Sequence, residues 1–135
     1  MQKTNSAFAM VGLALWLGAS TASWGWGAQP IQNVIDAPVA STTPMPVAKV
    51  KTSILVAGTE LGWKMAETGP GVIQGTLNLR KHTAVVDITY TATKYSIVYK
   101  SSINLDEKDG QIHKNYNSWV QNLSRKIGAE QLRQQ

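Results

Sequence analysis

Residues 72–100 read VIQGTLNLRKHTAVVDITYTATKYSIVYK, and apolar and polar side chains alternate along most of this stretch. Alternation with a period of two is typical of β-strands that bury one face. The pattern predicts strands over residues 72–79, 82–91 and 95–100, joined by links of hairpin length. A turn at Gly69, Pro70 and Gly71 connects them to an earlier strand over residues 63–68. The sequence therefore predicts an antiparallel meander of four strands.

Segments on both sides of the meander carry apolar residues at helical spacing. The first helix is expected from Val47 to Leu61, with Gly62 as its left-handed stop. The second follows an apolar stripe from Ile112 to Ile127, and Asp109 just upstream is a candidate cap. Both helices are expected to cover the apolar face of the sheet. The predicted class is α+β, with an N-terminal helix, a four-stranded antiparallel meander and a C-terminal helix.

The first 22 residues have the three parts of a secretory signal peptide. Lys3 precedes an uncharged apolar run over residues 7–17, and small residues follow as far as Ala22. That run is about half of the roughly 20 residues that a membrane-spanning helix needs, so no permanent transmembrane anchor is expected. Cleavage after Ala22 is favoured over the alternative after Ala28. The sequence thus predicts an exported protein that is periplasmic or, alternatively, secreted.

Residues 23–46 have a different composition. They hold four of the five prolines of the chain and a single charge, which predicts an extended tether. Two tryptophans in this segment, Trp24 and Trp26, are candidates for docking on a surface, although they are equally consistent with the tail of the export signal. This division leaves residues 47–135 as one α+β domain.

The chain contains no cysteine, which excludes a disulfide, a thiolate metal site, a cysteine nucleophile and a lipid-modified N-terminal cysteine. Its formal net charge of +5 favours an anionic partner in the envelope, such as an acidic glycan or an acidic protein. Nucleic acid is not expected as a partner, because Tyr95 and Tyr99 share the apolar register of Ile97 and therefore point toward the core.

No catalytic or cofactor motif stands out from the sequence. The two histidines, His82 and His113, lack metal-ligand spacing, and neither a serine nucleophile motif nor a phosphate-binding glycine loop occurs. The acidic residues at Asp106, Glu107 and Asp109 cluster in a polar loop, where water should solvate them. We expect no metal and no cofactor, and a binding protein is favoured over an enzyme.

Two strings, HTAVVDITYTATKYSIVYKSSINL (82–105) and IHKNYNSWVQNL (112–123), carry a family resemblance. Over about residues 61–127 the chain resembles a group of short bacterial envelope proteins, many of them predicted lipoproteins, with no established activity. The resemblance implies the order strand, strand, loop, helix. Because this chain lacks the lipoprotein cysteine, membrane anchoring is not carried over. The matching positions for a shared binding site are Tyr95, His113, Tyr116, Asn117 and Trp119. Tyr116 and Trp119 also lie on the apolar stripe, which favours a core role for both.

Three functions are consistent with these features. The first is a non-enzymatic binding or accessory protein of the cell envelope, which uses the polar sheet face or the groove beside the final helix. The second is a periplasmic immunity-type inhibitor of a toxin or hydrolase. The third is an enzyme in which His113 acts as general acid or base near Tyr116 and Asp109.

Overall fold

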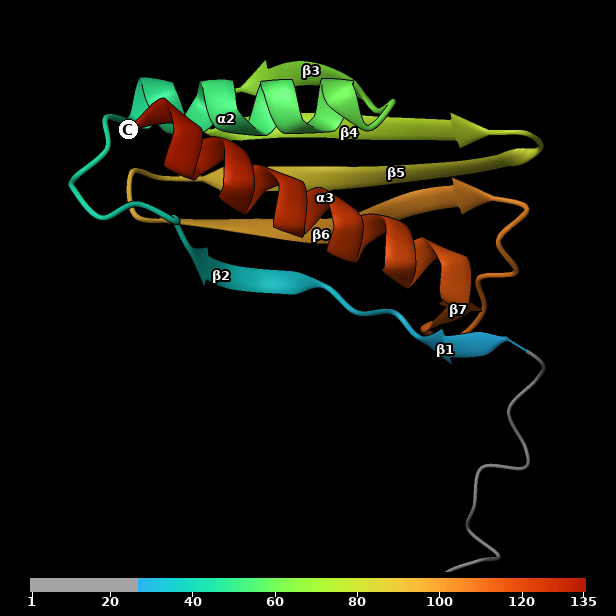
Figure 1. Cartoon of the computed structure of the whole chain (residues 1–135). Coiled ribbons are helices and arrows are strands. Elements are labelled where there is room, and N and C mark those ends of the chain that lie inside the picture. Colours follow the sequence, from blue (N-terminus) through green and yellow to red (C-terminus); the bar gives the residue numbers. More distant parts are fainter. Residues whose placement is uncertain (1–26) are drawn as a thin grey trace, which may run out of the picture.

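The computed structural model describes residues 27–135, so the predicted signal peptide (1–22), Trp24 and Trp26 lie outside the described residues. Its elements, in chain order, are β1 (Ala28–Pro30), β2 (Val34–Pro38), α2 (Val47–Glu60), β3 (Lys64–Gly69), β4 (Val72–Leu79), β5 (His82–Tyr90), β6 (Lys94–Ile103), β7 (Gln111–His113) and α3 (Lys114–Gln134) (Figure 1). The predicted α+β class is confirmed.

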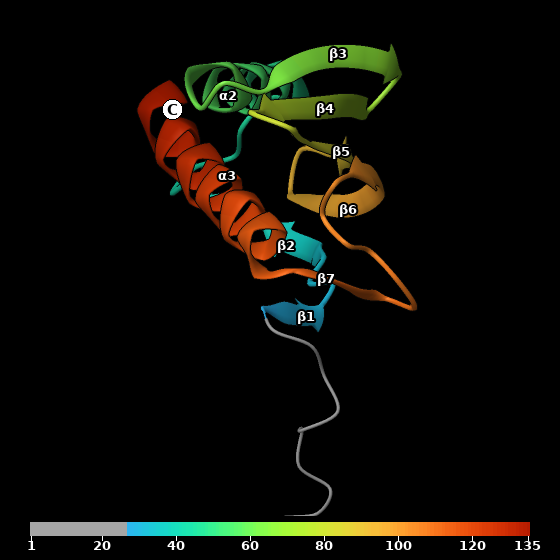
Figure 2. The ribbon, with the colours of Figure 1, turned by 90° about the vertical axis from the view of Figure 1, so that its right-hand side faces the viewer.

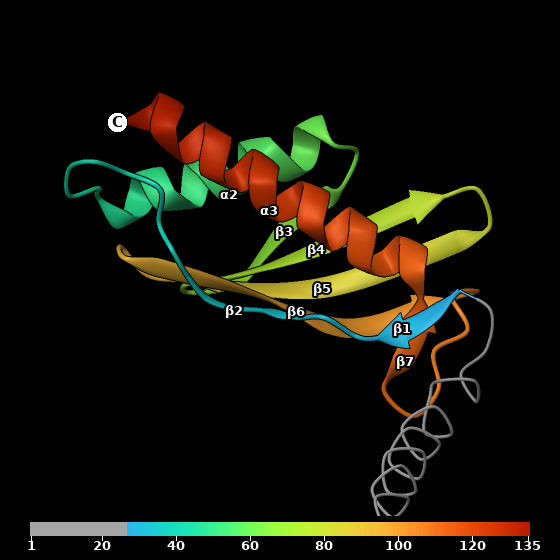
Figure 3. The same cartoon turned by 60° about the horizontal axis from the view of Figure 1, so that its bottom comes forward.

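The main sheet has five antiparallel strands in the order β2-β6-β5-β4-β3, and β1 pairs with β7 in a second, two-stranded sheet. The predicted meander is the run β3 to β6. Both helices cover the same face of this sheet (Figures 2 and 3). That face is apolar because alternate residues of each central strand point toward the helices. Its fully or nearly fully buried side chains are Ile73, Leu77, Ala84, Val86, Ile88, Tyr95 and Ile97.

The part of the predicted tether (23–46) that the structure describes is not a free spacer. Residues 28–46 form β1, β2 and a connection to α2, which together we call the strap. Three of its four prolines stand where no ladder donor is needed: Pro30 and Pro38 end short strands, and Pro46 is the N-cap of α2. As an edge strand, β2 pairs only with β6. The strap is therefore part of the domain.

The helix boundaries follow the predicted signals at α2 and depart from them at α3. Gly62 has a positive φ of 91°, and Trp63 N–H donates to the Gly58 carbonyl over 2.9 Å, which closes α2 as expected. Ile112, predicted to start the last helix, instead pairs with Gln29 in the β1–β7 ladder. The N-cap of α3 is consequently His113 and not Asp109.

The core lies between the sheet and the two helices. Tyr116 of α3 is completely buried, and its ring meets that of Tyr99 from β6 edge-on at 5.5 Å between centroids. From residue 27 to the end of the chain, no helix has the length and apolar character needed to cross a membrane. The packed helices leave two grooves along α3, and these define the candidate site.

Candidate binding grooves beside the final helix

Tyr95 is buried between β6 and α3. Its ring is 5% exposed, and its hydroxyl lies 2.7 Å from the Ser124 hydroxyl, with which it forms a hydrogen bond. A buried tyrosine whose hydroxyl finds a partner on another element joins the two elements, here β6 and α3. Tyr95 is therefore removed from any surface that a ligand reaches.

Asn117 of α3 binds the strap through its side-chain amide. Its Oδ1 accepts a hydrogen bond from Gln32 N–H at 3.0 Å, and its Nδ2 donates to Gln29 Oε1 and to the Pro30 carbonyl, each at 3.0 Å. These three bonds use both hydrogens of the amide and one side of its oxygen. At 4% exposure, Asn117 is a buried clamp between α3 and the strap.

His113 and Tyr116 do not meet in an accessible site. Nδ1 of His113 accepts a hydrogen bond from Asn115 N–H at 3.1 Å, so this ring caps the helix. The hydroxyl of Tyr116 is buried without a hydrogen-bond partner, and burial raises the pKa of its phenol well above the ordinary value. A proton relay between His113, Tyr116 and Asp109 has no support in this arrangement.

Trp119 is half-buried and lines a small apolar notch on the flank of α3 that faces α2. The notch has a volume of about 80 Å³ and is lined by Leu61, Trp63, Leu77, Trp119 and Asn122. Its floor continues along β4, since Leu79 lies on the same strand face as Leu77 and is 45% exposed. The ring of His82 stands beside Trp119, with 6.4 Å between centroids. The notch thus opens toward the β4–β5 turn.

On the other flank of α3 lies a polar groove of about 390 Å³, which we call the amide groove. It runs between the helix and the strap and is lined by Gln29, Gln32, Asn117, Ser118, Gln121, Asn122 and Arg125. Arg125 is the only charged residue of the lining. Its Nη2 donates to Asn122 Oδ1, which orients the guanidinium at the groove.

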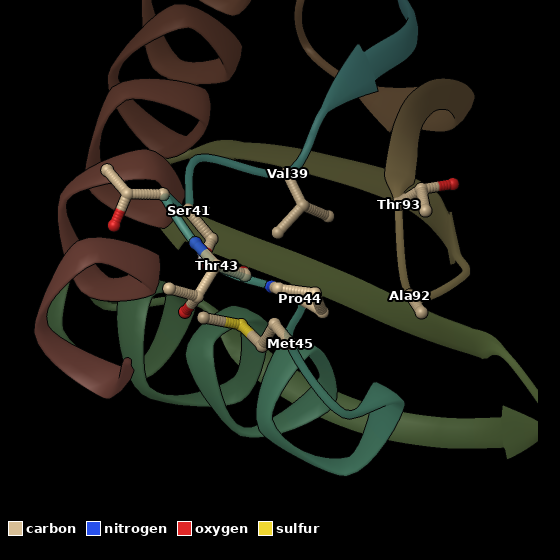
Figure 4. Close-up of a pocket in the computed structure, with 8 residues that line it drawn as sticks. Val39, Ser41, Thr43, Pro44, Met45, Ala92 and Thr93 are labelled. Carbon is tan, nitrogen blue, oxygen red and sulfur yellow. Dashed lines mark hydrogen bonds between the residues drawn. The ribbon is translucent and has the colours of Figure 1, made fainter.

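A third cavity, of about 270 Å³, lies between the strap and the β5–β6 turn (Figure 4). Its lining includes Val39, Ser41, Thr43, Met45 and Thr93, and no titratable side chain is among the lining residues. Within residues 27–135, no three histidine or carboxylate side chains come together as a metal site. The two grooves beside α3 are therefore the strongest candidates.

Comparisons of the chain with protein-family models, curated proteins and solved structures give no match.

The sequence singles out one residue of each groove, Trp119 of the notch and Asn117 of the amide groove. It does not indicate the others, and the amides at Gln29 and Gln32 fall in the segment predicted to be a tether. Polar residues at Ser118, Gln121, Asn122 and Arg125 follow the helical repeat opposite the apolar stripe, a signal that is also typical of an ordinary solvated face. Only the folded strap turns that face into a groove.

Proposed function

We propose that this protein is a non-enzymatic binding or accessory module of the bacterial cell envelope, which docks another envelope protein at the apolar notch. The observation that carries the proposal is the exposed apolar surface around the notch. Leu61 is 38% exposed and Leu79 is 45% exposed, and the half-buried Trp119 lies with them on one side of the domain. Tryptophan in a partly enclosed apolar site is a frequent anchor of protein interfaces.

The positive charges near the notch indicate the chemistry of the partner. β4, which contributes Leu77 to the notch, leads past Leu79 into the β4–β5 turn, whose two turn residues are Arg80 and Lys81. Neither has a carboxylate within 4.0 Å among residues 27–135. We infer a partner segment that places a small apolar side chain in the notch and carries acidic residues beside it. The predicted signal peptide and the resemblance to envelope proteins support the proposal that this encounter takes place in the envelope.

Site-specific photocrosslinking in the producing bacterium tests the proposal. A photoreactive phenylalanine analogue replaces Leu79 in one variant and Ile35 in another. Ile35 is a matched control, because it is exposed (62%) but lies on β2, at the far edge of the sheet. We expect a discrete adduct from position 79 alone, with an acidic partner peptide at the crosslink. The double variant Arg80→Glu, Lys81→Glu should reduce that adduct at least fivefold.

Equal adducts from positions 79 and 35, or an adduct unaffected by reversing the two charges, would contradict a docking site at the notch. The adduct also separates the binding and inhibitor hypotheses, because mass spectrometry identifies the partner. A captured toxin or hydrolase whose activity falls when the protein is added would make this protein an inhibitor.

A further inference from the structure

The amide groove has the chemistry of a saccharide site. Five carboxamide side chains line it together with the hydroxyl of Ser118: those of Gln29, Gln32, Asn117, Gln121 and Asn122. A carboxamide offers both a donor and an acceptor, as does a sugar hydroxyl, so the two groups pair in either direction. The groove holds about 390 Å³, within the range of sites that take small ligands.

Two of these five amides have no internal partner. Within the described chain, no hydrogen bond is made by the side chains of Gln32 and Gln121. Gln29 uses its oxygen to accept from Asn117, and Asn122 uses its oxygen to accept from Arg125, which leaves the NH₂ group of each amide available. The groove is therefore rich in donors.

Arg125 adds one positive charge at the helix side of the groove. It forms no ion pair with a carboxylate among residues 27–135, whereas Glu60, Glu67 and Asp87 each pair with a lysine elsewhere. A guanidinium presents parallel N–H donors that match the two oxygens of a carboxylate. Because the remaining lining is neutral, the site fits a ligand with one carboxylate and several hydroxyls.

We propose that the amide groove binds an acidic saccharide, with the sugar carboxylate on Arg125 and the hydroxyls on Gln32, Gln121 and Asn122. A phosphate-rich polymer fits less well, because its units offer few hydroxyls to the amide groups of the lining. An extended peptide also fits less well, since the lining has no apolar pocket for its side chains. The groove shares one lining residue, Asn122, with the notch on the other flank of α3, whereas Gln32, Gln121 and Arg125 line the groove and not the notch.

Nuclear magnetic resonance tests the proposal directly, because the side-chain amide signals of the groove report contact with a ligand. The ¹⁵N-labelled protein is titrated with tetrasaccharides of hyaluronan, polygalacturonate and alginate, which all contain uronic acids. Chitotetraose, a neutral saccharide, is the control ligand. We expect at least one uronic-acid ligand to shift the amide signals of Gln121 and Asn122, with at least tenfold higher affinity than chitotetraose.

The variant Arg125→Gln removes the charge and retains a hydrogen-bonding amide. It should weaken binding of the acidic ligand at least tenfold while leaving the melting temperature within about 2 °C, because Arg125 is exposed. Lys64→Gln is the matched control, since it removes the same charge from exposed β3, and it should bind as the unmodified protein does.

Three results would overturn the proposal. The first is the absence of any shift with all three uronic-acid ligands at 10 mM. The second is an equal loss of affinity in Arg125→Gln and Lys64→Gln. The third is a triglutamate peptide that shifts the same amide signals at a lower concentration than the saccharides, which would assign the groove to an acidic peptide.

Discussion

On the flank that faces the strap, α3 makes its contacts through carboxamides; on the flank that faces α2 and the sheet, it makes them through apolar side chains. Asn117 and Gln131 bond to strap atoms near β1 and after β2, whereas Val120, Leu123 and Ile127 are fully buried in the core. Hydrogen bonds are directional and contribute little net free energy, while apolar burial contributes more and specifies no direction. The amides thus position the strap, and the apolar flank stabilises the domain.

Truncating the apolar flank should have the largest effect. Leu123 is completely buried, so we expect Leu123→Ala to lower the free energy of unfolding by about 2–5 kcal/mol through lost burial and a residual cavity. Urea denaturation followed by circular dichroism measures this cost. Leu132→Ala is the control on the same helix, because Leu132 is 50% exposed and should change stability by about 0.5 kcal/mol or less. Equal costs for the two would remove the distinction between the flanks.

Removing the clamp at Asn117 should have a smaller and more local effect. Asn117→Ala leaves Gln32 N–H and the Pro30 carbonyl without their buried partner, at a cost of about 1–3 kcal/mol. Backbone amides of residues 28–38 should exchange faster than in the unmodified protein, whereas the protection of β4 and β5 should not change. Uniformly faster exchange across the sheet would show that the clamp stabilises the core as well.

Gln131 should matter less than Asn117, although it is also buried. Its Oε1 accepts from Ala40 N–H at 2.7 Å, but its Nε2 is buried without a hydrogen-bond partner. Gln131→Leu loses the hydrogen bond to Ala40 N–H, but it also removes the buried Nε2 that has no partner. We therefore expect a net loss of stability of about 1 kcal/mol or less. Urea denaturation of Asn117→Ala and Gln131→Leu ranks the two losses of stability. A larger loss for Gln131→Leu would contradict the interpretation that its unpartnered Nε2 offsets its hydrogen bond.

The exposed ion pair between the helices should have the smallest effect. Lys126 Nζ lies 3.0 Å from Glu60 Oε1, and this hydrogen bond with its charge lowers the pKa of Glu60 below its ordinary 4.5. A lowered pKa stabilises the fold above pH 4.5, and this contribution disappears as the pH falls through the folded-state value. The melting temperature of Glu60→Gln should therefore be slightly lower at pH 7 and should converge with that of the unmodified protein near pH 3. A difference in melting temperature that persists at pH 3 would show that packing, and not the ion pair, causes the loss of stability.

The meander and both helices were predictable because their signals are local. Alternation along residues 72–100 and the stripe through Tyr116, Val120 and Leu123 each record burial within one element. The pairing of the strap was not predictable, since Ala28 meets His113 across most of the domain and β1 has only three residues. Short strands with prolines have no distinct periodicity, so their partners are set by tertiary contacts.

The candidate site was predictable only in part, and for a related reason. Asn117 was singled out as a binding residue, but its hydrogen bonds are all directed to the strap. Trp119 is both a candidate binding residue and a member of the predicted apolar stripe, and the structure leaves it half-buried at the notch. In both cases the residue type was informative, while its role depended on a neighbour from a distant part of the chain.

The long sequence separation between the strap and its partners has a consequence for the order of folding. Gln32 meets Asn117 across 85 residues and Ala40 meets Gln131 across 91, whereas the hairpins of the meander close over short turns. Closing a long loop costs more chain entropy and slows the contacts that depend on it. We therefore expect the strap to dock last, and until it does, β6 presents an unpaired edge that another strand can occupy.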